Sequence, residues 1–422
     1  MTSARLVVVT IVIALAACIS QISACTAFCI HKGGQPVVGR NYDWGFNECI
    51  IFINKSGLSK TAFAYYGEAA DNPAQWVSRY GSATFCQYGR ENGFVGMNEA
   101  GLVVHQLYLS EAQFPVPDTR KSVSMDQWVQ YQLDNFATVA EVIASDKTLR
   151  IRQPAGNYSR VHFFVTDKSG ASAVIEHLNG VMVCHVGVDL PYAALANDTY
   201  DNSLDYLNKG ISDTTSTGSL DRFFRAATLA KNYDTAVAPG TYAAYILSRT
   251  EQGSTQYSIV FDPKGLYVAF KSQANRQFRY FTLASFDLSC RTPVKMMNVE
   301  AVTSGDATAG FADYSTQANT TLIQHAWVNL GITIYQPALD LFARYPEQFS
   351  CADAGVAPVS LQLPELNSSM AARQFDLLGR LLGTAVGRFP VRAGTIVRIH
   401  KQSCGEGSAE RAGAGGIIII DK

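Results

Sequence analysis

The sequence has little net charge, few histidines and none of the common zinc or serine hydrolase motifs. Its 34 Lys and Arg residues nearly balance 35 Asp and Glu, which gives a net charge of -1 and no basic field to attract nucleic acid. The seven histidines are scattered, and neither HExxH nor GxSxG occurs. We therefore expect no nucleic acid partner, no metal and no organic cofactor.

The nine cysteines form no CxxC pair and no zinc-like spacing. Cys25 and Cys29 share one face of a predicted strand but are too far apart along it to form a disulfide. Disulfides among the other cysteines remain open, because spacing alone does not assign them.

One long apolar run stands at the N-terminus. Arg5 is the only charged residue before "LVVVTIVIALAACI", a run that is too short and too close to the terminus for a convincing membrane span. We interpret residues 1–24 as an export signal that is removed after Ala24. The mature protein would then be secreted or periplasmic and would begin at Cys25.

Two cysteines give a competing interpretation of the same segment. "LAAC" ends at Cys18 and "ISAC" ends at Cys25, and both resemble bacterial lipidation sites. A lipidated chain would be a lipoprotein, and only in that case do we expect a membrane as partner. The alternative function would be that of a lipid-anchored envelope protein with a binding role, which the intact mass of the mature chain would reveal.

The pattern of apolar residues predicts blocks of strands and helices. We expect hairpins at "CTAFCIHKGGQPVVGRNYDW" and "GFVGMNEAGLVVHQLYL", and a helical region over residues 124–144 with a break at the capping box "TVAE". Strands follow in "VHFFVTDKSGASAVIEHLNGVMVCHV", helices in "RFFRAATLAKNY" and "TYAAYILSR", and strands in "TQYSIVFDPKGLYVAFKS". Such blocks are typical of an α+β fold rather than of alternating βαβ units.

The texture of the sequence changes near residue 300. We place one domain at residues 25–299 and a C-terminal extension at residues 300–422, in which residues 322–345 predict one or two helices. The Gly/Ala-rich tail predicts flexibility. The extension would cap the domain, serve in assembly as a homo-oligomer, or be loosely ordered, and the sequence does not choose among these roles.

A cysteine that becomes the first residue combines a nucleophile and a base. Its thiol attacks a carbonyl carbon, and its α-amine, with a pKa of about 7.7–8.0, accepts the thiol proton. Arg40 would favour the thiolate of Cys25, and Asp43 would hold the amine. Residues three apart on a regular strand point to opposite faces, so we expect the strand to bend or end between Arg40 and Asp43.

The ordered segments "CT", "GRNYDW", "GMNEAGL", "LANDTYDN", "DRFFRAA" and "STQYS" resemble the choloylglycine hydrolase and penicillin V acylase family over residues 25–289. That family belongs to the N-terminal nucleophile hydrolases, so the resemblance implies a four-layer αββα sandwich. It also implies an amidase that hydrolyses linear, non-peptide C–N bonds of a small-molecule substrate, with no cofactor.

The resemblance assigns roles to particular residues. Cys25, Arg40 and Asp43 match the family's cysteine, arginine and aspartate; Asn197 matches its oxyanion donor, and Arg222 matches the arginine that opens a later helix. Tyr108 falls where bile salt hydrolases carry Asn and Gram-positive penicillin V acylases carry Tyr, with a backbone N–H in the oxyanion hole. Penicillin V acylase-like substrates therefore rank first, followed by conjugated bile salts and N-acyl homoserine lactones.

Simpler interpretations exist for the same residues. Arg40 and Asp43 would form a surface ion pair, Arg222 would only extend over the start of a helix, and Tyr108 would belong to the core. Asn197 stands in a formal glycosylation sequon, "NDT", which an active-site position would leave unused.

Overall fold

The structure is a computed structural model of the chain. It describes residues 24–32, 34–63, 71–152, 160–210 and 215–352, and two short strands, β22 (Arg373–Phe375) and β23 (Leu381–Thr384). The predicted leader before Ala24, the whole lipidation motif that ends at Cys18, and the predicted flexible tail lie outside the described residues.

The N-terminal strand lies inside the first of two large sheets, sheet A. β1 and β2 form the predicted hairpin, which turns at Gly34 with a φ of 77°, a conformation that favours glycine. The order in this seven-stranded sheet is β14-β1-β2-β15-β16-β17-β19. The bounds are β1 (Ala24–Lys32), β2 (Gln35–Asp43), β14 (Ala194–Leu195), β15 (Thr255–Asp262), β16 (Tyr267–Ser272), β17 (Arg279–Thr282) and β19 (Gly305–Asp306).

Sheet B has nine strands in the order β13-β12-β11-β8-β7-β6-β3-β18-β20. It contains the second predicted hairpin, β7 to β8, and the predicted run β11 to β13. The bounds are β3 (Ile50–Asn54), β6 (Ser82–Cys86), β7 (Gly93–Asn98), β8 (Val103–Tyr108), β11 (Val161–Thr166), β12 (Ser172–Leu178), β13 (Val181–Val186), β18 (Lys295–Asn298) and β20 (Ala312–Asp313).

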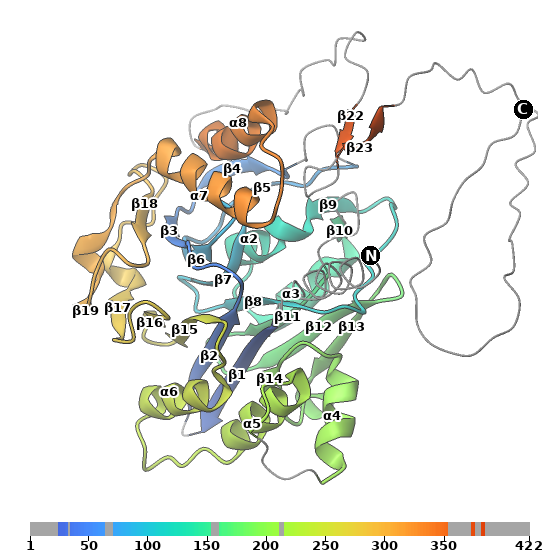
Figure 1. Cartoon of the computed structure of the whole chain (residues 1–422), viewed down its shortest axis with the longest axis vertical. Helices are drawn as coiled ribbons and strands as arrows, with labels where there is room; N and C mark the ends of the chain where they lie inside the picture. The colour runs from blue at the N-terminus through green and yellow to red at the C-terminus, as the bar shows by residue number, and fades with distance from the viewer. Residues whose placement is uncertain are drawn as a thin grey trace, which may run out of the picture.

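Helices cover the outer face of each sheet. α5 (Ser219–Lys231) packs on β1 and α6 (Pro239–Thr250) on β2, while α4 (Tyr200–Asn208) lies beside α5. On the other side, α2 (Met125–Asn135) packs on β7 and β8 and is followed by α3 (Val139–Ala144), which starts at the predicted capping box of Thr138. The layers run helix, sheet, sheet, helix, and Figure 1 shows α4, α5 and α6 on the side opposite α2.

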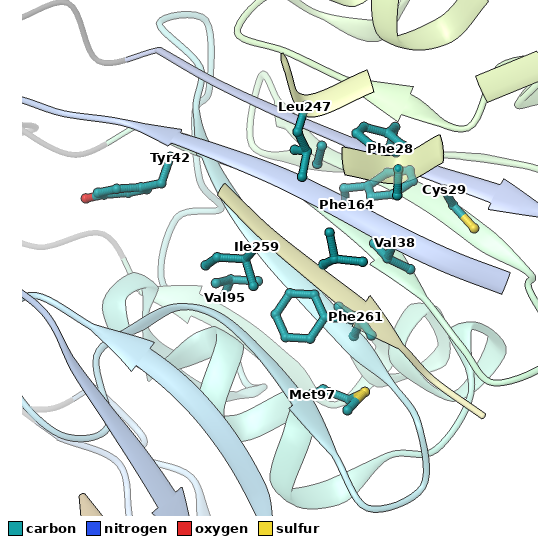
Figure 2. Close-up of a cluster of buried hydrophobic side chains, with 14 of the residues drawn as sticks. Phe28, Cys29, Val38, Tyr42, Val95, Met97, Phe164, Leu247, Ile259 and Phe261 are labelled. Atoms are coloured by element: carbon teal, nitrogen blue, oxygen red, sulfur yellow. The ribbon is translucent and has the colours of Figure 1, made fainter. Parts of the chain in front are cut away.

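Two apolar clusters fill the spaces between these layers. The larger joins sheet A to α5 and α6 on one face and to sheet B on the other, and the smaller lies between sheet B and α2. In Figure 2, Val38, Ile259 and Phe261 of sheet A lie close to Val95 and Met97 of sheet B. The predicted α+β class and the four-layer αββα arrangement are confirmed.

The chain continues across residue 300 without leaving this body. β19 pairs with β17 in sheet A, and β20 pairs with β18 in sheet B. Residues 322–345 contain most of α7 (Thr316–Asn329) and all of α8 (Gln336–Arg344), as the sequence predicts. A disulfide between Cys290 and Cys351 ties the end of this segment back to the chain before it.

Smaller elements complete the described chain. The parallel pair β9 (Lys121–Ser124) and β10 (Leu149–Arg152) lies beside α2, and a three-stranded sheet joins β4 (Leu58–Thr61), β5 (Gln75–Val77) and β21 (Ser350–Cys351). Single 3-10 turns occur at Ser145–Lys147, Gly187–Asp189, Leu283–Ser285, Thr308–Gly310 and Tyr345–Gln348. None of the helices in the described ranges has the length and apolar content needed to cross a membrane.

Candidate active site

The pairing of β1 with β2 sorts the predicted site residues onto two faces of sheet A. Cys25 lies opposite Tyr42, and Ala27 lies opposite Arg40. Because alternate residues of a strand face opposite sides, the side chains of Cys25 and Arg40 share the face toward sheet B. Asp43 has the opposite parity and faces the helices. All of these residues are buried.

A guanidinium group contacts the sulfur of Cys25. Arg40 Nη2 lies 3.3 Å from Cys25 Sγ and 2.7 Å from the carbonyl oxygen of Gln106 on β8. The guanidinium carbon lies 5.4 Å from the ring centroids of both Tyr42 and Phe94. Two aromatic rings and a carbonyl therefore orient the arginine that contacts the thiol.

Burial nevertheless has the largest effect on the pKa of the Cys25 thiol. Loss of solvation raises the pKa of Cys25, the charges of Arg40 and Arg222 and a backbone hydrogen bond from Asp43 lower it, and the net shift is upward. Arg40 alone therefore does not produce a thiolate near neutral pH. For this sulfur to act as a nucleophile, a base would have to take its proton.

The backbone of Cys25 has its own set of partners. Its nitrogen, still in the peptide bond to Ala24, donates to Asn197 Oδ1 at 2.6 Å. Arg222 Nη1 donates to the carbonyl oxygen of Cys25 and, at 2.7 Å, to Thr26 Oγ1. Arg222 Nη2 donates to Asn197 Oδ1 at 2.9 Å. One arginine at the start of α5 thus links Cys25 to Asn197.

Asp43 lies at the end of β2, beside this arginine. Its carboxylate accepts hydrogen bonds from Gln252 Nε2 at 2.6 Å and from Thr255 Oγ1, and it lies 3.7 Å from Arg222 Nη1. Burial raises the pKa of Asp43, and Arg222 and the two hydrogen bonds oppose that rise. A register shift between Thr255 and Tyr257 on β15 occurs at this point of the pairing with β2.

The expectation that the strand bends or ends between Arg40 and Asp43 was wrong. β2 runs unbroken from Gln35 to Asp43 and pairs with β1 at every position. The two side chains lie on opposite faces because they are three residues apart on a regular strand. Arg40 contacts the sulfur, while Asp43 lies on the face of Arg222, which binds the carbonyl group.

The end of β8 supplies two free carbonyl groups to the site. The pairing of β7 with β8 reaches only to His105, so the strand beyond it has no partner on that side. There the carbonyl of Gln106 accepts from Arg40, and the carbonyl of Tyr108 accepts from Asn197 Nδ2 at 2.8 Å. The pairing of β7 with β8 therefore stops early enough to leave both carbonyl groups for these side chains.

The backbone N–H of Tyr108 points in the same direction as its carbonyl. In an antiparallel strand these two groups share one side, and the next residue, Leu109, donates to Arg160 on the other side. The N–H of Tyr108 therefore projects toward Asn197. The Tyr108 side chain is 38% exposed, so the alternative in which it belongs to the core is wrong.

Several partners of the site were not identified from the sequence. They are Thr26, which binds Arg222; Gln252 and Thr255, which bind Asp43; and Ser219, whose Oγ accepts from the Asn197 backbone at 2.8 Å. Strand alternation places Thr26 on the face of Asp43, and Thr255 stands within the segment "STQYS". Both residues could therefore have been identified as site partners from the sequence. Gln252 and Ser219 lie on a loop and at a helix start, where no periodicity marks them.

The site holds no group of metal ligands. Across the described ranges, no cluster of three or more His, Cys, Asp or Glu side chains could hold a metal ion. The polar atoms around Cys25 are instead amide, guanidinium and carboxylate groups that bind one another.

Comparison with known proteins relates part of the chain to a family. Residues 25–217 match the model of the linear amide C–N hydrolases, choloylglycine hydrolase family, and the match starts at Cys25. This part of the chain is similar to the choloylglycine hydrolase family. A penicillin V acylase of Pectobacterium atrosepticum is 30% identical over 233 residues, which are 50% of this chain and 60% of that protein. The match thus spans less than two thirds of that relative.

Solved structures of choloylglycine hydrolase relatives share the fold. The penicillin V acylase of Agrobacterium tumefaciens aligns with a TM-score of 0.60 at 25% identity, over 69% of this chain and 98% of that one. A conjugated bile acid hydrolase variant of Clostridium perfringens aligns with a TM-score of 0.55 at 17% identity, over 67% and 98%. The four-layer αββα sandwich is therefore of the N-terminal nucleophile hydrolase type.

Proposed function

We propose that the chain is an exported amidase that hydrolyses linear, non-peptide amides with Cys25 as its N-terminal nucleophile, and that its substrates are penicillin V acylase-like. The observation that carries this proposal is the separate binding of the three reactive parts of Cys25. Its sulfur contacts Arg40, its nitrogen contacts Asn197 and its carbonyl oxygen contacts Arg222.

Removal of residues 1–24 would convert this arrangement into a catalyst. A peptide nitrogen has no lone pair to offer, whereas a free α-amine accepts a proton near neutral pH. Asn197 Oδ1, which accepts the N–H of Cys25 at 2.6 Å, would hold that amine in place. The raised pKa of the thiol makes this base necessary.

The reaction would follow acyl transfer. The sulfur attacks the amide carbon as the amine takes its proton, and negative charge develops on the former carbonyl oxygen. The second N–H of Asn197 Nδ2 and the backbone N–H of Tyr108 would stabilise that oxyanion. The amine then protonates the leaving nitrogen, and water releases the acid from the thioester with the amine as base.

The similarity to penicillin V acylases, at 30% identity to one and 25% to another, supports their substrate class ahead of that of the bile acid hydrolase at 17%. The exposed Tyr108 side chain lies where it would contact the acyl group. N-acyl homoserine lactones and conjugated bile salts remain the comparison substrates.

One experiment tests the nucleophile, the processing and the substrate class together. The protein is expressed with its leader, the mature N-terminus is sequenced and its intact mass measured, and release of amine is assayed on penicillin V, a glycine-conjugated bile salt and an acyl homoserine lactone. We expect a mass that starts at Cys25, turnover of penicillin V, and no turnover by Cys25→Ala.

A diacylglycerol adduct on Cys25 would occupy the sulfur as a thioether, leave no nucleophile, and support the lipid-anchored binding protein instead. Undiminished turnover by Cys25→Ala would refute the mechanism. Preferred turnover of the bile salt or the lactone would retain the mechanism and replace the substrate class.

A further inference from the structure

Asn197 belongs to a short segment, residues 196–200, that is held from behind by two buried side chains of sheet B. His162 on β11 has Nε2 2.9 Å from the carbonyl oxygen of Ala196 and Nδ1 3.0 Å from Glu176 Oε1 on β12. The same carboxylate oxygen accepts the backbone N–H of Tyr200 at 3.1 Å. The pair thus holds both ends of the segment, with Asn197 between them.

The partners of His162 hold its ring in one orientation. The Ala196 carbonyl only accepts, so Nε2 of His162 donates to it, while Nδ1 lies against the Glu176 carboxyl group. Both side chains are buried, with exposures of 0% and 1%. Buried polar groups without partners are costly, so these contacts favour one arrangement of the two side chains.

His105 and His177 are also buried in sheet B but lack this connection. Within the described chain, neither ring nitrogen of His105 nor Nδ1 of His177 has a hydrogen-bond partner. The ring of His185 on β13 lies near the same carboxylate, with Nε2 3.7 Å from Glu176 Oε2. His162 has a partner at both nitrogens, and one partner is the residue that precedes Asn197. Packing alone does not require this arrangement, since His105 and His177 are buried without it.

The position of Asn197 matters because its amide makes several contacts in one small volume. Oδ1 accepts from Cys25 and Arg222, and Nδ2 donates to the Tyr108 carbonyl. A shift of the Ala196 carbonyl moves the next residue with it. In the proposed mechanism, a displacement of about 1 Å costs on the order of 100-fold in rate.

We propose that His162 and Glu176 are positioning residues for Asn197, which hold residues 196–200 so that the Asn197 amide meets both the Cys25 amine and the oxyanion. Neither side chain touches the substrate. The inference rests on the proposed function, in which Asn197 orients the amine and donates to the developing charge.

His162→Gln tests the pair, and His177→Gln is the matched control. His177 is equally buried and lies on β12, but its ring makes no hydrogen bond to residues 196–200 among the described contacts. We expect kcat of His162→Gln to fall about 10- to 100-fold, with KM within about twofold of wild type, and His177→Gln to keep wild-type kcat.

A double-mutant cycle separates positioning from a general structural effect. If His162 acts through Asn197, the variant with both Asn197→Ala and His162→Gln is no slower than Asn197→Ala alone. Additive losses would overturn the proposal, as would wild-type kcat in His162→Gln or an equal loss in His177→Gln. Where His162→Gln does not fold, Glu176→Gln, which keeps the acceptor oxygen, takes its place with the same readouts.

Amide hydrogen exchange measures how firmly residues 196–200 are held and needs no activity assay. We expect the backbone amides of Asn197 and Tyr200 to exchange about tenfold faster in His162→Gln than in wild type or His177→Gln. A wild-type enzyme that cleaves none of the three amides would defeat the proposed function, whereas unchanged exchange in His162→Gln would defeat the positioning pair. The two failures are therefore distinguishable.

Discussion

Arg40 and Asp43 lie on opposite faces of one unbroken strand, yet both act around the same cysteine. Arg40 Nη2 is 3.3 Å from the Cys25 sulfur, whereas Asp43 is 3.7 Å from Arg222, which binds the Cys25 carbonyl oxygen. The strand therefore separates two sets of contacts. On one face of sheet A Arg40 contacts the Cys25 sulfur, and on the other Asp43 lies beside the arginine that binds the Cys25 carbonyl oxygen.

Replacement of Arg40 by Gln should shift the reactivity of Cys25 to higher pH. The arginine charge lowers the pKa of a thiol that burial raises, so its loss removes a stabilising charge from the thiolate and raises that pKa further. We expect the alkylation of Cys25 by iodoacetamide, mapped by peptide mass, to move up by about 1–3 pH units. Arg79→Gln, at an exposed arginine, is the control, and an unmoved profile in Arg40→Gln would contradict the assignment.

Arg222→Lys should impair catalysis while the fold persists. A lysine keeps the charge but has one nitrogen, which cannot bind the Cys25 carbonyl, Thr26 and Asn197 together. We expect kcat to fall on the order of 100-fold. Arg225, one turn later on α5, donates instead to the carbonyl oxygens of Arg249 and Ser216. Arg225→Lys should therefore keep the wild-type kcat. Similar losses in both variants would show that the effect is not local to Cys25.

Gly39→Ala should destabilise the fold. A Cβ at this position would lie 2.2 Å from Phe28 Cζ, because the Phe28 ring covers Gly39 across the hairpin of β1 and β2. We expect the free energy of unfolding to fall by about 1–3 kcal/mol, measured in urea. A Cβ at Gly45 meets nothing within 4 Å, so Gly45→Ala should leave the unfolding midpoint in place. Equal stability of the two variants would disprove the close packing of Phe28.

Loss of the disulfide should weaken the C-terminal part of the fold. Cys290 and Cys351 are 61 residues apart in sequence. Their disulfide reduces the conformational entropy of the unfolded chain over that loop. We expect the double variant with serine at both positions to lose about 2–4 kcal/mol of unfolding free energy. Neither cysteine contacts Cys25 or its hydrogen-bond partners described above, so kcat should stay at the wild-type value below the melting transition. A drop in kcat there would show coupling between this link and the site.

The free energy of unfolding should depend on pH through the carboxyl group of Glu176. Burial raises the pKa of its carboxyl, but the hydrogen bond with His162, the nearby ring of His185 and the N–H of Tyr200 outweigh burial and lower it from 4.5 to about 2. A depressed folded-state pKa stabilises the fold above pH 4.5, and the contribution is lost as the pH falls toward 2. The difference in unfolding free energy between wild type and Glu176→Gln should shrink over this window. A constant difference from pH 6 to pH 2.5 would argue against an ionised Glu176.

Much of the secondary structure could be predicted from local patterns. Alternating apolar residues and glycine turns gave both hairpins, and the capping box at Thr138 gave the break before α3. These signals act between near neighbours, so no tertiary contact is needed to form them. The boundary expected near residue 300 rested on composition. Composition carries no information on strand pairing, and β19 and β20 pair with strands of sheet A and sheet B.

The sequence by itself determined the identity of the central residues, because Cys25, Arg40, Asp43, Asn197 and Arg222 stand in ordered motifs. Only the tertiary structure decided which atom each residue meets. It brings Asn197 to Cys25 across 172 positions of chain and puts the His162–Glu176 pair behind it. Such contacts depend on how two sheets stack and where the pairing of β7 with β8 stops, and neither property has a local signal. Residue types can therefore be read along the chain, whereas hydrogen-bond partners arise only when distant strands come together.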